Sequence, residues 1–150
     1  MIQRKQTIYL LIAVVLSVIT LSSQIATVTD QGLTVSRLYN LLYTDVMGAA
    51  HYNVWPLFLI LLLAAAVSFY TIFIYKQRMR QAVLCMVAIM AYVAWYIALI
   101  VFSKMLAPDA LNFQLSWTAA LPAVSVIFCF MARKAIIADE KLVRAADRIR

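Results

Sequence analysis

Two long apolar runs separated by a short basic segment constrain the fold of this chain more than any other feature. Residues 54–75 and 82–102 contain no Asp, Glu, Lys, Arg or His, and each run exceeds the roughly 20 residues that a helix needs to cross a bilayer core of about 30 Å. The segment between them is long enough only for a turn between antiparallel helices. These runs therefore predict a helical hairpin in a membrane.

Composition agrees with a membrane location. Of the 150 residues, 66% are hydrophobic and 13% are charged, which is far from the average of soluble domains. The net charge of +7 would suggest nucleic-acid binding in a soluble protein, but here the basic residues lie at the ends of apolar runs. We therefore expect a single membrane domain over residues 1–150 and no nucleic-acid partner.

Two further apolar runs bring the expected membrane helices to four. Residues 7–26 follow Arg4 and Lys5, as in a secretory signal, but this run exceeds the 7 to 15 residues of a signal's apolar region and lacks a small-x-small cleavage site. We therefore expect a retained helix there. The last run, 115–131, contains Pro122, whose missing N–H predicts a moderate kink. The expected fold class is all-α, an integral membrane four-helix bundle.

The longest polar connection covers residues 27–53. Its middle, Leu33 to Tyr43, mixes apolar and polar residues in a way that fits either a short interfacial helix or a weak hairpin, and periodicity does not decide between them. All Lys and Arg residues except Arg37 and Lys104 lie in the leader, the 76–80 turn or the tail 132–150. Because short basic loops stay on the cytoplasmic side, both termini are expected in the cytoplasm and 27–53 outside.

The tail 132–150 predicts an amphipathic cytoplasmic helix, continuous with the fourth span or separate from it. Its apolar residues recur at steps of three and four, and Glu140 and Arg144 form a favourable i,i+4 pair. The tail could anchor to anionic headgroups, or its apolar stripe could dock on the chain's own inner loops or on a partner subunit. The candidate residues for headgroup or partner binding are Lys76, Arg78, Arg80, Arg133, Lys134, Glu140, Leu142, Arg144 and Arg148.

A second candidate set lies within the spans. Ser17, Tyr92, Pro122 and Ser125 are expected near the bilayer midplane, with Tyr96 on the same helix face as Tyr92. A tyrosine hydroxyl in hydrocarbon needs a partner, so we expect Tyr92 or Tyr96 to bond to a serine or to the carbonyl that Pro122 frees. Such a set forms either a polar clip between helices or the lining of a small ligand cavity.

Catalytic chemistry has no basis in this sequence. The spans carry no ionisable Asp, Glu, Lys, Arg or His, the groups that mark proton and ion pathways in membranes. His51 is the single histidine, and Cys85 and Cys129 lack the C-x-x-C spacing of redox or zinc sites. With two glycines in all, the chain has no phosphate-binding loop. We therefore expect no enzyme, cofactor or metal.

Four stretches resemble a known family. They are Met1-Ile-Gln-Arg4, Gln6-Thr-Ile-Tyr-Leu-Leu11, Tyr75-Lys76-x-Arg78 followed by Leu84-Cys85, and Asp139-Glu-Lys-Leu-Val-Arg-Ala-Ala-Asp-Arg-Ile-Arg150. They are similar to an uncharacterised family of bacterial four-helix inner-membrane proteins, known as a domain of unknown function. Ala145, Ile149 and Lys5 are mild departures from its expected pattern. The resemblance implies four spans and a bacterial inner membrane, and it supplies no catalytic residue.

The leading functional hypothesis is a non-catalytic accessory or scaffolding subunit of a larger inner-membrane complex for transport, secretion or envelope assembly. It is based on an inert membrane core combined with a patterned cytoplasmic tail. The alternative is a small-molecule or lipid transporter acting as a homo-oligomer, which needs a cavity that reaches the midplane. An intramembrane enzyme ranks third because it needs catalytic groups that this chain lacks.

The charge distribution predicts a topology that fusion reporters can test. A cytoplasm-active reporter fused after Arg150 should be active, because the basic segments hold both termini inside. An export-dependent reporter inserted within residues 27–53 should be active outside. A reporter after Arg150 that is active outside would contradict this topology.

Overall fold

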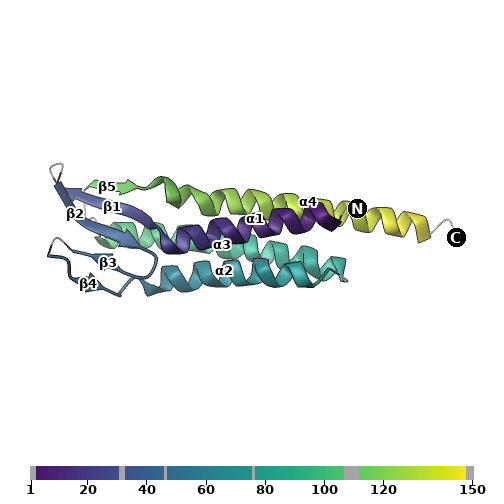
Figure 1. Cartoon of the computed structure of the whole chain (residues 1–150), viewed down its shortest axis with the longest axis horizontal. Coiled ribbons are helices and arrows are strands. Elements are labelled where there is room, and N and C mark those ends of the chain that lie inside the picture. Colours follow the sequence, from purple (N-terminus) through teal and green to yellow (C-terminus); the bar gives the residue numbers. More distant parts are fainter. Residues whose placement is uncertain (1–2, 31–32, 46, 76, 107–111, 148–150) are drawn as a thin grey trace.

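Four long helices lie side by side in a computed structural model that describes residues 3–30, 33–45, 47–75, 77–106 and 112–147 (Figure 1). All four are long and apolar enough to cross a membrane. Both α1 and α3 pack against α2 and α4, so the helices follow one another around an antiparallel bundle. The helices are α1 (Gln3–Ser22), α2 (Trp55–Phe73), α3 (Arg78–Leu106) and α4 (Leu121–Asp147).

A five-stranded antiparallel sheet covers one end of the bundle (Figure 1). The expectation of a purely α-helical fold is therefore wrong. Leu33 to Tyr43 forms no interfacial helix; most of it is a strand that pairs with both of its neighbours in the chain. The strand order is β4-β3-β2-β1-β5, with β1 (Gln24–Asp30), β2 (Leu33–Tyr39), β3 (Tyr43–Thr44), β4 (Ala50–His51) and β5 (Asn112–Leu115).

The change from α1 to β1 occurs four residues before the expected end of the first span at residue 26. Hydroxyls close the helix there: Ser22 and Ser23 donate to the carbonyls of Val18 and Ile19, at 3.2 and 2.7 Å. These are bonds from a serine side chain to the carbonyl four residues earlier, and in the last turn they compete with the continuation of the helix. The β-branched residues that follow favour an extended strand, and Val28 is 1% exposed against the bundle end.

A buried asparagine joins the sheet to the helices. Asn40, directly after β2, is 0% exposed. Its side-chain nitrogen donates to the Thr20 carbonyl near the end of α1 at 2.7 Å, and its side-chain oxygen accepts from the Trp95 indole of α3 at 3.0 Å. On the other side of the sheet, Thr118 donates to the Gln24 carbonyl. The sheet is therefore hydrogen-bonded directly to three parts of the bundle.

Helix α4 begins differently from the prediction. A 3-10 turn, η1 (Trp117–Ala120), precedes it, and Pro122 is its second residue rather than an interior residue. In the first turn of a helix a missing N–H has no helical partner to lose, so the reason for an interior kink disappears. The Thr118 carbonyl, which the proline was expected to free, accepts the Leu121 N–H.

The predicted tail is a direct continuation of α4. The helix runs without interruption to Asp147 and extends past the ends of the other three helices (Figure 1). Its bundle-facing side holds Cys129, Ala132 and Ile136, which are at most 1% exposed. Leu142, from the expected apolar stripe, is 61% exposed, so it does not dock on the chain's own inner loops.

Removing the buried amide should loosen the sheet from the bundle. Asn40→Ala leaves the Trp95 N–H and the Thr20 carbonyl without their partner, and it should lower the free energy of unfolding by about 1–3 kcal/mol. Asn53→Ala is the control, because Asn53 is exposed, and it should change stability by less than about 0.5 kcal/mol. Unfolding in mild detergent measures both; equal effects would contradict the anchoring role.

Candidate functional site

A layer of hydroxyl groups lies inside the bundle. The Tyr92 hydroxyl of α3 is 2.7 Å from the Ser17 hydroxyl of α1 and 3.4 Å from the Ser68 hydroxyl of α2. All three residues are 0% exposed. Ser17 and Ser68 also donate to carbonyls one turn back in their own helices, at 2.8 and 2.9 Å. The layer thus joins three helices through one tyrosine.

The fourth helix enters the same layer through Ser125 and Cys129. Ser125 is 0% exposed and donates to the Ala13 carbonyl of α1 at 3.2 Å. The Cys129 sulfur lies 3.9 Å from the Ser68 hydroxyl, a weak contact of the kind that a buried thiol makes. The structure therefore brings predicted residues Ser17, Tyr92 and Ser125 into one region and adds Ser68.

Tyr96 forms a separate bridge at the start of α4. Its hydroxyl donates to the Ala119 carbonyl at 2.7 Å and accepts the Ala123 N–H at 2.9 Å. These two backbone groups are four residues apart, the spacing of a helical hydrogen bond, so the hydroxyl takes the place of one backbone link beside Pro122. The Tyr96 hydroxyl therefore provides a hydrogen-bond partner for a backbone group before Pro122 and for one after it, and it links α3 to α4.

This polar interior is suited to holding helices together. Each hydroxyl bonds to another hydroxyl, a thiol or a backbone carbonyl, and packed side chains enclose its oxygen.

Among the described residues, no group of three or more His, Cys, Asp or Glu lies in a metal-binding arrangement. Cys85 and Cys129 are both buried as free thiols. His51 stacks on Tyr43 in the sheet, with ring centroids 4.9 Å apart.

An ion pair fixes α4 at the opposite end of the bundle from the sheet. Arg78, in the first turn of α3, lies 3.0 Å from the Asp139 carboxylate, and the two side chains are 25% and 12% exposed. The same guanidinium donates to the Asp139 carbonyl at 3.4 Å. Half-buried charge pairs of this kind are costly to break, because the remaining charge loses its partner. Arg78 is therefore a helix-positioning residue.

The other predicted basic residues that the structure describes have environments of their own. Lys134 lies 4.9 Å from the centre of the Phe130 ring, a cation–π distance. The buried Arg133 Nε has no hydrogen-bond partner within the described part of the chain. Farther along α4, Arg144 donates to Glu140 at 3.0 Å. Lys76 and Arg148 lie outside the described residues.

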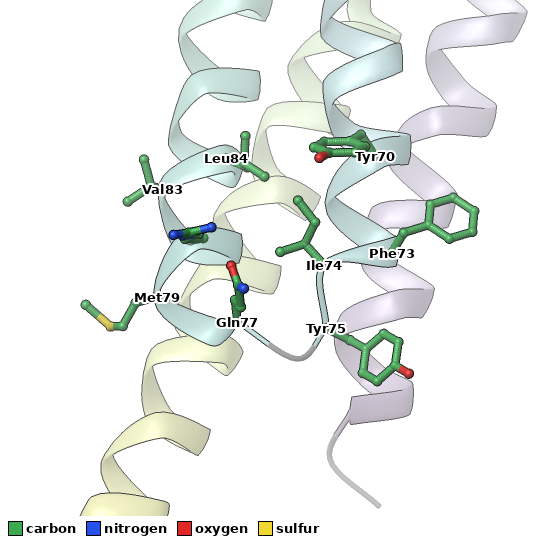
Figure 2. Close-up of a pocket in the computed structure, with 9 residues that line it drawn as sticks. Tyr70, Phe73, Ile74, Tyr75, Gln77, Met79, Val83 and Leu84 are labelled. Atoms are coloured by element: carbon green, nitrogen blue, oxygen red, sulfur yellow. The ribbon is translucent and has the colours of Figure 1, made fainter.

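A groove of about 910 Å³ opens between the end of α2 and the start of α3. Figure 2 shows Ile74 and Gln77 between the two helix ends, with Tyr70 on the α2 side and Leu84 on the α3 side. We call this cavity the turn groove. It is lined by Tyr70, Phe73, Ile74, Tyr75, Gln77, Met79, Arg80, Val83 and Leu84.

Several of these residues were not expected from the sequence. Asp139 is the acid that pairs with Arg78, and no local pattern connects positions 61 residues apart in the chain. Ser68 had a detectable signal, since it lies four residues from Ala64, a spacing of small residues that favours close helix packing. Asn40 had none, because a polar residue in a loop is ordinarily exposed.

A comparison with protein families matches nearly the whole chain to one family. The profile described as "Domain of unknown function (DUF4293)" matches residues 2–149. The chain belongs to the DUF4293 family. A comparison with curated proteins finds no match.

Membership in the DUF4293 family agrees with the resemblance seen in the sequence. The match extends from the leader through the sheet to the end of α4, so the bundle and the sheet belong to one family unit. The family's description assigns no activity.

Removing the central hydroxyl tests the contribution of the buried layer to stability. Tyr92→Phe should lower the free energy of unfolding by about 0.6 kcal/mol and by no more than about 1.7, the range measured for hydrogen bonds between membrane helices. Ser17 keeps its bond to the Ala13 carbonyl, which limits the loss. Tyr70→Phe is the matched control, because Tyr70 is 58% exposed, and it should be neutral in the same unfolding assay. An equal loss in both variants would contradict the bonding role of Tyr92.

Proposed function

We propose that this DUF4293 protein is a non-catalytic accessory or scaffolding subunit of a larger bacterial inner-membrane complex for transport, secretion or envelope assembly. The observation that carries the proposal is the end of α4, which continues beyond the rest of the bundle (Figure 1). A helix that leaves its own bundle presents side chains that only another molecule can cover.

The projecting part of α4 is held in a defined direction. The Arg78–Asp139 ion pair lies at its base, and the residues from Glu140 to Asp147 add about 12 Å of helix at 1.5 Å per residue. On this segment Leu142 and Val143 are 61% and 40% exposed. Exposed apolar side chains on a positioned helix favour docking into a groove of a partner.

The charge distribution supports a cytoplasmic location for this helix. Arg78, Arg80 and the basic residues of α4 lie at the same end of the bundle as the start of α1 and the end of α4 (Figure 1). Basic segments of this kind remain in the cytoplasm and bind anionic headgroups. In this arrangement the sheet lies outside, and the partner of α4 is an integral membrane protein with a cytoplasmic face.

The alternative hypothesis, a homo-oligomeric transporter for small molecules or lipids, needs a continuous cavity that reaches the midplane. Within this bundle, the centre is filled by the layer formed by Ser17, Ser68 and Tyr92, and all three residues are 0% exposed. A path would have to separate hydroxyls that are 2.7 Å apart. The geometry therefore favours the subunit hypothesis over the transporter.

Co-purification with charge reversals in α4 tests the proposal. The tagged protein, extracted from native membranes in gentle detergent, should carry a stoichiometric membrane partner identified by mass spectrometry. The double variant Arg144→Glu and Arg148→Glu should lose most of that partner, because the first change places a second carboxylate beside Glu140, where an ion pair stood.

Lys104→Glu serves as the control, since Lys104 lies at the sheet end of α3 and its reversal should leave the partner bound. Recovery of the monomer alone from wild-type membranes would contradict the subunit hypothesis. A partner that stays bound to the double variant would show that α4 is a membrane anchor and not a docking helix.

A further inference from the structure

We propose that the turn groove binds one anionic phospholipid from the surrounding leaflet of the membrane. In this arrangement the phosphate meets Arg80, and an acyl chain lies along the apolar wall between α2 and α3. This inference goes beyond the proposed function, because it requires only that the helices cross a bilayer and does not depend on a protein partner.

The groove has room for a lipid headgroup with part of its chain, and it has a polarity gradient that matches a phospholipid. Its volume of about 910 Å³ lies within the range of small-molecule sites, roughly 300–1,000 Å³. Val83, which is 61% exposed, and Leu84 line the part farther from the turn, whereas Gln77 and Arg80 line the part next to the turn. An apolar wall that ends in polar donors matches a lipid, whose chain and headgroup differ in the same way.

Arg80 is the cation that is available to a phosphate. Arg78 is already paired with Asp139 at 3.0 Å, whereas Arg80 is exposed and has no ion pair within the described part of the chain. No acidic residue lines the groove among the residues that the structure describes. A guanidinium that is not engaged in an ion pair can donate two parallel hydrogen bonds to phosphate oxygens.

The position of the groove along the bundle agrees with this occupant. It lies where α2 ends and the apolar sequence gives way to the basic turn, which is the level of the headgroups if the helices are centred in the bilayer. Tyr70 and Tyr75 also line it, and tyrosines are enriched near the headgroups. A helix from a second protein would meet charge at one end of this wall, whereas a lipid places its phosphate there.

Native mass spectrometry can test the site directly. The protein is reconstituted with equal amounts of phosphatidylglycerol and phosphatidylcholine, released, and scored for the fraction of molecules that retain a lipid. Wild type should retain one phosphatidylglycerol in preference to phosphatidylcholine. Arg80→Gln should lower that retention about tenfold, the loss expected when one charged hydrogen-bonding group is removed.

Two matched pairs of variants distinguish lipid binding in the turn groove from attraction of lipids by net charge. Lys104→Gln removes one cation from the other end of α3, and it should leave retention unchanged. Val83→Trp fills the groove while keeping every charge, and it should lower lipid retention. Val101→Trp places the same side chain near the sheet, where Val101 is 53% exposed, and it should leave lipid retention unchanged.

Three results would overturn the proposal. Equal losses in Arg80→Gln and Lys104→Gln would mean diffuse attraction by net charge. Equal retention of both lipids by wild type would remove the role of Arg80. A dimer mass in place of the lipid adduct, abolished by Val83→Trp, would assign the groove to a second copy of the chain. None of these results depends on a protein partner of α4, so the two proposals fail independently.

Discussion

Buried polar groups in this bundle have almost no water to bond with, and the rest of the structure depends on how they are paired. A hydroxyl surrounded by apolar side chains must find a partner within the protein. Tyr92 takes Ser17 and Ser68, Tyr96 takes the backbone of the first turn of α4, and Asn40 takes Trp95 and Thr20. These bonds set the relative depth of the four helices, since none of them survives a shift of one helical turn.

The sequence was sufficient to predict the four helices, but it was not sufficient to predict the sheet. Apolar runs of membrane length define four helices because a bilayer permits little else in its core. The strands are short, and their side chains alternate only weakly, so β1 and β2 gave no clear periodic signal. The last part of the expected first span was assigned to a helix because Ile25 and Ala26 are apolar. They are buried, but in a strand against the bundle end.

The candidate site residues divide in the same way into those that the sequence predicted and those that it did not. Depth matching predicted that Tyr92 or Tyr96 would face the bundle near a serine, because that argument needs only helix length and the cost of an unpaired hydroxyl. The position of Pro122 was misjudged, since the start of α4 depends on contacts with β1 that lie far away in sequence. The Arg78–Asp139 pair and the turn groove depend on which helices are neighbours. That information is absent from local patterns.

The uninterrupted course of α4 has a mechanical consequence. From Leu121 to Asp147 the helix measures about 40 Å at 1.5 Å per residue. Its beginning is tied to the strands, because the preceding residues Ser116 and Thr118 bond to the backbone of Ile25 and Gln24. The helix is thus held to the sheet at its start, and the Arg78–Asp139 ion pair holds it again just before its projecting end. A twist applied to the projecting end would therefore load that ion pair before it reached the strands at the other end of the bundle.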